Sequence, residues 1–190
     1  MSRFFSDKYK DLEPYTPGEQ PKDTKYIKLN TNESPFAPLA EVVEAAEAAA
    51  SNLQLYSDPA CSKLISKLSE VYNAGPEHII AANGSDETLY FAFLAYCDDR
   101  HGAAFPDITY GFYPVFAEFT GVPYTQIPLK DDFSVDIKDY IGINKTIFIA
   151  NPNAPTGICL ASSDIEMILR SNPDNMVIVD EAYVDFGGES

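Results

Sequence analysis

Short apolar runs along the chain alternate with longer segments whose apolar residues recur every three or four positions. Such runs are typical of buried strands, and such segments are typical of amphipathic helices. Strands or extended segments are expected at residues 26–30, 78–82, 102–105, 123–129, 146–150 and 176–179. Helices are expected at residues 39–53, 61–73, 85–97, 112–120, 135–141 and 162–171, the last opened by a serine cap. This alternation predicts an α/β fold with three α/β/α layers and a mostly parallel sheet covered on both faces.

The start of the chain differs from the rest, because residues 1–24 are polar and rich in proline. They predict an N-terminal arm, taken as residues 1–28, ahead of one α/β domain at residues 29–190. The first twenty residues lack the basic start and the continuous apolar core of a signal peptide. No apolar run approaches the ~20 residues of a membrane helix. We therefore expect a soluble cytoplasmic protein.

Charge and cysteine content narrow the classes of partner. The chain has 29 acidic and 13 basic residues, a net charge of −16, which argues against nucleic acid and anionic membranes as partners. Three separated cysteines, Cys61, Cys97 and Cys159, are expected to be reduced and packed. The only two histidines, His78 and His101, show no ligand-like spacing, so no metal site is predicted.

Polar clusters follow four of the expected strands at their carboxyl ends. In order they read NGSDE, PDITYGFY, NPNAPTG and DEAY. Ligands of open α/β sheets bind outside the carboxyl ends of the strands, so one composite ligand site is expected at this edge.

The last cluster places Asp180 at the end of an apolar run and Tyr183 three residues later. A buried carboxylate needs a cationic partner, and a protonated heterocycle nitrogen would serve. Tyr183 could then donate a hydrogen bond to a phenolate oxygen on the same ring. The alternative is that Asp180 caps the following turn.

The other clusters each allow two interpretations. In NGSDE, the backbone N–H groups and hydroxyl of Gly84, Ser85 and Asp86 would suit a phosphate at a helix N-terminus, or Ser85 is an ordinary N-cap. Tyr110 could stack on a planar ring or simply pack. NPNAPTG is either a rigid turn whose amides face a ligand or a plain connecting loop.

Five motifs in order, LNTNESPFAP, YSDP, NGSDE, NPNAPTG and VDEAYVDF, resemble the fold-type-I aminotransferases that use pyridoxal 5′-phosphate, and most of all the histidinol-phosphate type. The resemblance implies that Asp180 pairs with the pyridinium nitrogen, Tyr183 bonds the phenolic oxygen of the ring and Tyr110 stacks on the ring. It also implies that Gly84, Ser85 and Asp86 hold the cofactor phosphate.

Further roles implied by the resemblance lie elsewhere in the chain. Tyr56 would reach the phosphate of the neighbouring subunit in a homodimer, and Asn32 and Glu33 would lie near the substrate. Where the family usually has the asparagine that contacts the phenolic oxygen, this chain has Ala154. Asn153 is taken as the replacement ligand, with Asn151, or Tyr183 alone, as the alternatives.

The resemblance also implies parts that residues 1–190 do not contain. The Schiff-base lysine is expected beyond Ser190, so residues 29–190 would be a partial cofactor-binding large domain without the small C-terminal domain. The implied reaction transfers an amino group between histidinol phosphate or a related amino acid and a 2-oxoacid, and the isolated chain is expected to be inactive. The alternatives are a fragment resembling a threonine-phosphate decarboxylase or a general or aromatic aminotransferase, and a non-catalytic module that binds a phosphorylated ligand.

Overall fold

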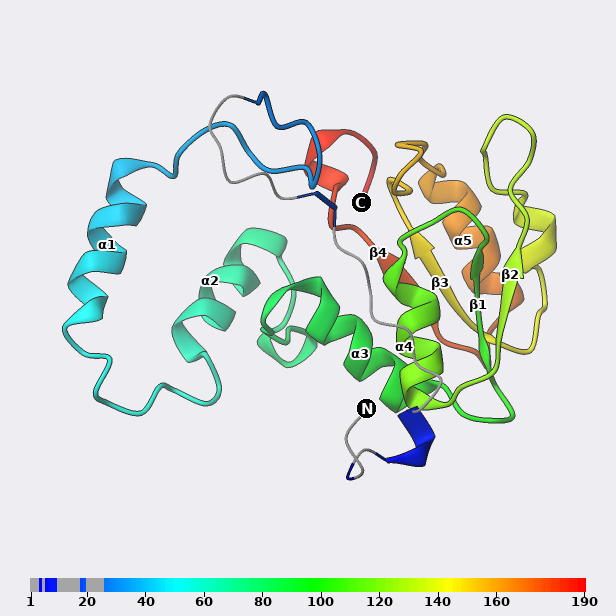
Figure 1. The fold of residues 1–190 in the computed structure, drawn as a ribbon, viewed down its shortest axis with the longest axis horizontal. Coiled ribbons are helices and arrows are strands. Elements are labelled where there is room, and N and C mark those ends of the chain that lie inside the picture. Colours follow the sequence, from blue (N-terminus) through cyan, green and yellow to red (C-terminus); the bar gives the residue numbers. More distant parts are fainter. Residues whose placement is uncertain (1–3, 5, 10–17, 20–25) are drawn as a thin grey trace. The chain divides into compact units, whose positions relative to one another are not determined.

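The computed structural model describes residues 4, 6–9, 18–19 and 26–190 (Figure 1). The chain divides into two compact units. One unit comprises Ala82–Ser190 together with Met1–Tyr15, and the other comprises Thr16–Ala81. The first unit holds the sheet, and the second is helical in its described part. The predicted division into an arm and a partial large domain stays a prediction.

The sheet of the larger unit is parallel throughout. Its four strands are β1 (Ala103–Pro106), β2 (Tyr124–Ile127), β3 (Thr146–Ala150) and β4 (Val177–Asp180), in the order β2-β1-β3-β4. Every neighbouring pair runs parallel, and the last residues of β3 and β4, Ala150 and Asp180, are partners in register. The predicted parallel α/β sheet is therefore confirmed.

One face of the sheet packs against α3 (Gly84–Tyr96) and α4 (Phe112–Thr120) (Figure 1). Phe148 of β3 lies at the centre of this layer, where its ring stacks on that of Phe93 with centroids 4.2 Å apart. Both rings are fully buried. Aromatic side chains of the helices predicted at 85–97 and 112–120 thus form a large part of the core on this face.

The opposite face of the sheet packs against α5 (Ser162–Ser171) and the 3₁₀ helix η3 (Ile137–Tyr140). Ile147 and Ile149 of β3 point to this side, since side chains alternate along a strand. With helices on both faces, the three-layer prediction is confirmed. The remaining short elements are the 3₁₀ helices η1 (Asp7–Tyr9) and η4 (Val184–Phe186).

The unit Thr16–Ala81 contains α1 (Ala40–Ala50), α2 (Ser62–Tyr72) and the 3₁₀ helix η2 (Pro76–His78). Both α-helices match the predicted segments to within a few residues. Neither contains a buried residue.

Two predicted strands, 26–30 and 78–82, are wrong. Ile79 has extended backbone angles, but neither segment pairs with a strand among the described residues. Most of their large apolar side chains are exposed, at 88 % for Ile27 and 75 % for Ile80, and Ile79 is half-buried. An apolar run indicates burial potential, whereas a strand also needs hydrogen bonds from a neighbouring strand.

The short helix expected at 135–141 is present as the 3₁₀ helix η3. Two smaller expectations need correction. The helix at 162–171 begins after Ala161 and has no side-chain cap, so the serine cap is wrong. Cys61 and Cys159 are free but exposed, and not packed as expected. In the described part of the chain, no helix has both the length and the apolar character to cross a membrane.

Candidate active site

A small pocket of about 80 Å³ lies at the carboxyl edge of the sheet. Its lining residues come from the end of β3 and from all four predicted polar clusters, and they are Ser85, Tyr110, Ala150, Pro152, Ala154, Asp180, Ala182 and Tyr183. Four residues singled out from the sequence, Ser85, Tyr110, Asp180 and Tyr183, therefore share one cavity. Parallel strands bring their carboxyl ends to the same edge, which explains why the segments after β1, β3 and β4 meet here. Ser85 comes instead from the first turn of α3 (Gly84–Tyr96).

Asp180 is the acidic group of this pocket. It is half-buried at the end of β4, so the expectation of a fully buried strand end is only partly met. Asp180 Oδ1 accepts a hydrogen bond of 3.2 Å from the backbone N–H of Ala182, and Oδ2 accepts one of 3.0 Å from the Tyr113 hydroxyl. The turn-capping interpretation is thus correct for one oxygen. Asp180 takes part in no ion pair among the described residues.

Tyr113 was not identified as a site residue from the sequence. It is fully buried in the first turn of α4. Burial raises the pKa of its phenol far above the ordinary value, and the negative charge of Asp180 raises this pKa further. The hydroxyl therefore stays protonated and donates to Asp180. Its spacing of three residues from Tyr110, at a helix start, is the only sequence signal that could have indicated this role.

Helix α3 begins at the pocket without a side-chain cap. Its N-cap residue is Asn83, so the interpretation of Ser85 as the N-cap is wrong. The carboxylate of Glu87 instead accepts a hydrogen bond of 2.7 Å from the backbone N–H of Asn83. The N–H groups of Gly84, Ser85 and Asp86 lie in the first turn, where no helix carbonyl precedes them. This end of α3 retains the donors and the positive dipole that suit an anion.

Gly84 has φ +79°, in the left-handed region. An added Cβ would meet no atom within 4 Å, so conformation and not space demands glycine here.

The Tyr110 hydroxyl donates a 2.7 Å hydrogen bond to Asp86 Oδ1. The Tyr110 ring also contacts the Tyr113 ring edge to face, with centroids 5.7 Å apart and planes at 79°. Tyr110 therefore both packs against Tyr113 and lines the pocket. The Asp86 carboxylate is negative and already bonded, so only its backbone N–H suits a phosphate.

The side-chain amides of NPNAPTG bind other protein groups and tie this segment to the loop after β1. Asn153 is 4 % exposed, and it accepts a 2.7 Å bond from Thr109 Oγ1 and donates one of 3.0 Å to the Ile108 carbonyl. Asn151 accepts a 2.8 Å bond from the N–H of Leu160. Neither asparagine lines the pocket of Asp180. The structure thus does not bring Asn153 to this cavity, and its predicted cofactor contact stays a prediction.

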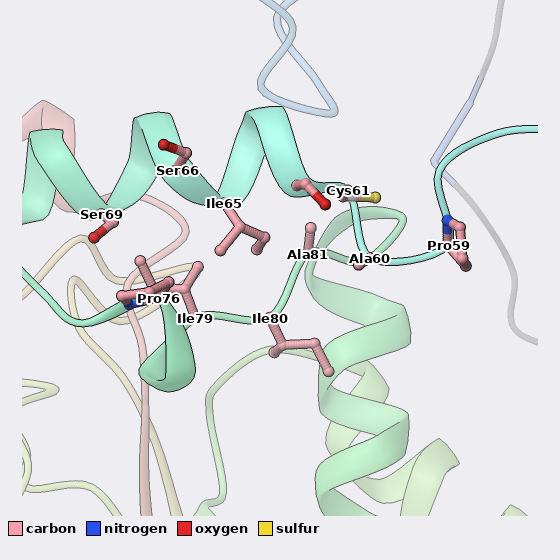
Figure 2. Close-up of a pocket in the computed structure, with 11 residues that line it drawn as sticks. Pro59, Ala60, Cys61, Ile65, Ser66, Ser69, Pro76, Ile79, Ile80 and Ala81 are labelled. Atoms are coloured by element: carbon pink, nitrogen blue, oxygen red, sulfur yellow. The ribbon is translucent and has the colours of Figure 1, made fainter.

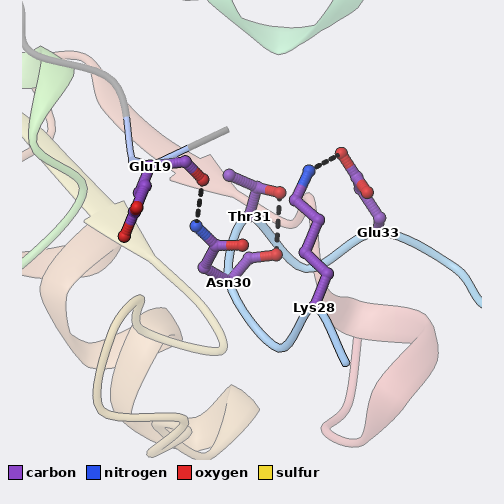
Figure 3. A network of polar contacts seen from close by, with 5 residues as sticks. All are labelled: Glu19, Lys28, Asn30, Thr31 and Glu33. Atoms are coloured by element: carbon purple, nitrogen blue, oxygen red, sulfur yellow. Dashed lines mark hydrogen bonds and ion pairs between the residues drawn. The ribbon is translucent and has the colours of Figure 1, made fainter. Parts of the chain in front are cut away.

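Three further predicted residues belong to the unit Thr16–Ala81. Tyr56 is fully exposed, and Asn32 follows Thr31 in a turn where both have positive φ, +53° and +62°. Glu33 pairs with Lys28, and the hydrogen bond from this lysine lowers the pKa of the Glu33 carboxyl (Figure 3). Their predicted roles at a phosphate and a substrate stay predictions.

A larger groove of about 530 Å³ in the same unit is mostly apolar. Figure 2 shows Ile65 of α2 pointing toward Pro76 and Ile79 across it. No charged side chain lines this groove, so it lacks the acid, base and anion-binding groups that the smaller pocket has.

Two solved structures with a similar fold are aminotransferases. Histidinol-phosphate aminotransferase from Sinorhizobium meliloti, solved in complex with pyridoxal-5′-phosphate, matches with a TM-score of 0.76 and 23% identity, over 82% of this chain and 44% of that chain. A mutant aspartate aminotransferase from Thermus thermophilus matches with a TM-score of 0.77 and 20% identity, over 94% of this chain and 50% of that chain. The fold is therefore that of about half an aminotransferase subunit.

The chain belongs to the family described as aminotransferase class I and II, whose model matches residues 24–190. Its members are enzymes with small-molecule substrates. Among curated relatives, histidinol-phosphate aminotransferase from Brachyspira hyodysenteriae is 50% identical over 98% of this chain and 53% of its own length. That from Clostridium acetobutylicum is 48% identical over 100% of this chain and 54% of its own length. The chain spans about half the length of these relatives, and the resemblance found in the sequence is confirmed.

Proposed function

We propose that this chain supplies the cofactor-binding half of a pyridoxal-phosphate-dependent aminotransferase of the histidinol-phosphate type. The reaction would transfer an amino group between histidinol phosphate, or a related amine, and a 2-oxoacid. One observation carries the proposal: Ser85, Tyr110, Asp180 and Tyr183 line one pocket. The identity of about half the residues to curated enzymes of this type supports the choice of substrate class.

The groups around the pocket fit pyridoxal phosphate by their chemistry. Asp180 offers an acceptor for a protonated ring nitrogen, and each of its oxygens has a lone pair beyond the bond it already accepts. The start of α3 offers backbone N–H donors for a phosphate. Three alanines, Ala150, Ala154 and Ala182, also line the pocket, and their short side chains suit a flat ring.

When bound, the cofactor supplies an electron-withdrawing ring that stabilises the negative charge developing on the substrate carbon. The Asp180 carboxylate would hold a proton on the ring nitrogen, because an adjacent negative charge favours the protonated base. The Tyr183 hydroxyl would donate to the ring oxygen. The Tyr110 ring would pack against the cofactor ring and keep water from it.

Other parts of the proposed enzyme lie outside this pocket. No lysine is among the described residues that line it, so the catalytic amine is not supplied by this lining. Tyr56 would reach the phosphate of a neighbouring subunit in a homodimer, and Asn32 and Glu33 would lie near the substrate. A cytoplasmic location completes the proposal.

Binding of pyridoxamine 5′-phosphate tests this function, since its amine cannot condense with a lysine and the chain can be used as it is. Ser85→Glu places a negative charge in the first turn of α3 and is expected to lower the affinity at least about tenfold. Ser163→Glu is the matched control, because Ser163 is exposed in the first turn of α5. Titration monitored by ligand fluorescence measures both variants.

The proposal predicts micromolar binding of pyridoxamine phosphate by the unmodified chain and unchanged binding in Ser163→Glu. Equal affinity for pyridoxamine phosphate and inorganic phosphate would support a plain phosphate-binding module instead. Equal losses in the two glutamate variants would remove α3 as the phosphate site.

A further inference from the structure

Behind the pocket, the carboxylate of Asp180 is held by two donors from different elements. The backbone N–H of Ala182, in the turn after β4, binds Oδ1, and the Tyr113 hydroxyl from α4 binds Oδ2 at 3.0 Å. Rotation of the carboxylate about its Cβ–Cγ bond would break both contacts. Together the two donors fix the plane of the carboxylate.

The ring of Tyr113 is itself immobilised. It is fully buried and contacts three aromatic rings, with centroid distances of 5.6 Å to Phe105, 5.7 Å to Tyr110 and 5.8 Å to Phe148. A hydroxyl on a ring packed from several sides has one direction available. Asp180, by contrast, is half-buried on a strand that has only β3 as a described neighbour. Packing around β4 alone therefore constrains the carboxylate less than Tyr113 does.

The chemistry of the donor matters as much as its position. A lysine or arginine at this place would neutralise the Asp180 charge and compete with a cationic ligand. The phenol of Tyr113 donates one hydrogen bond and remains neutral, because burial and the nearby charge raise its pKa. Asp180 thus keeps its negative charge for the pocket.

We propose that Tyr113 is a positioning residue that aims the Asp180 carboxylate at the ring nitrogen of the bound cofactor without neutralising it. This inference rests on the proposed function. It adds a residue that does not itself line the pocket and acts only through Asp180.

The test compares two probes on the 190-residue chain: pyridoxamine 5′-phosphate and its deaza analogue, in which a C–H group replaces the ring nitrogen. Tyr113→Phe keeps the buried ring and removes only the hydroxyl. The unmodified chain should prefer pyridoxamine phosphate. Tyr113→Phe should bind pyridoxamine phosphate about tenfold more weakly and the deaza analogue equally well, since one hydrogen bond to a charged group is lost.

Tyr140→Phe is the matched control. Tyr140 is 1 % exposed, and its hydroxyl has no hydrogen-bond partner among the described residues. It belongs to the opposite face of the sheet, so its removal should change neither affinity. A merely structural effect of Tyr113→Phe would weaken both probes alike, and that result would overturn the positioning role.

The outcomes separate the two proposals. If Tyr113→Phe prefers pyridoxamine phosphate over the deaza analogue as strongly as the unmodified chain does, the inference is overturned and the proposed function stands. No preference in the unmodified chain overturns the proposed function and the inference with it. Should Tyr113→Phe fail to fold, the NMR chemical shift of the Tyr113 ring carbon that bears the hydroxyl is compared between the unmodified chain and Asp180→Asn. Loss of the charged acceptor should move this signal, and an unchanged signal contradicts the contact.

Discussion

The Tyr110 hydroxyl and the Asp86 carboxylate are joined by a 2.7 Å hydrogen bond, which ties the loop after β1 to the first turn of α3. Two polar clusters that lie 24 residues apart are thereby held at one end of the pocket. The bond leaves the backbone N–H of Asp86 available and orients the Tyr110 ring. It also gives the Asp86 carboxylate a role other than contact with a phosphate, which its charge would oppose.

Removal of this bond by Tyr110→Phe should weaken binding of pyridoxamine phosphate by about threefold to tenfold, because the ring remains but loses its anchor. Tyr110→Ala should weaken binding further, since the ring is lost as well. Tyr124→Phe is the control, because its hydroxyl also binds a carboxylate, Glu118, at 3.0 Å but does not line the pocket. Fluorescence titration measures all three, and equal effects of Tyr110→Phe and Tyr124→Phe would contradict the anchoring role.

The left-handed conformation of Gly84 predicts a cost for any side chain. Gly84→Ala should lower the free energy of unfolding by about 1–2 kcal/mol, the penalty for an L-residue at positive φ. Gly111→Ala is a close control, because Gly111 has φ −66° and its added Cβ would also meet no atom within 4 Å. It should be neutral or stabilising by up to about 1 kcal/mol. Urea unfolding followed by circular dichroism measures the difference, and equal stabilities would refute the backbone argument.

The sequence predicted the parallel sheet and the meeting of the polar clusters after β1, β3 and β4, because both follow from periodicity and from the geometry of parallel strands. The sequence did not predict features that depend on a residue or strand far away along the chain. The apolar segment 78–82 has strand composition, yet it pairs with no described strand. Tyr113 is an ordinary aromatic residue in the sequence, and only the fold places its hydroxyl on Asp180, 67 residues later.

Asn153 provides a test between a role in the loop and a role at the cofactor. Asn153→Ala removes buried hydrogen bonds to Thr109 and Ile108 and should lower the free energy of unfolding by about 1–3 kcal/mol. The preference for pyridoxamine phosphate over its deaza analogue should not change, because Asn153 does not line the pocket. Asn144→Ala, at an exposed position, should affect neither quantity. Loss of the preference with unchanged stability would instead support a direct cofactor contact.

The three cysteines should differ in their reactivity with an alkylating reagent. Burial raises the pKa of the Cys97 thiol from 9.0 to about 11, because the thiolate is poorly solvated there. Cys61 and Cys159 are exposed. At pH 8 we expect rapid labelling of the two exposed thiols and at least tenfold slower labelling of Cys97. Mass spectrometry of tryptic peptides taken over time measures each site.

The same shift predicts the direction of the pH effect on stability. The folded chain holds the Cys97 proton more tightly than the unfolded chain, so the contribution is fully present below pH 9 and is lost as the pH rises toward about 11. Unfolding in urea at pH 8 and at pH 10 should therefore show a loss of stability that is smaller in Cys97→Ala. The exposed control, Cys159→Ala, should lose as much stability as the unmodified chain. If Cys97→Ala loses as much stability between pH 8 and pH 10 as the unmodified chain does, burial of the Cys97 thiol does not cause the pH dependence.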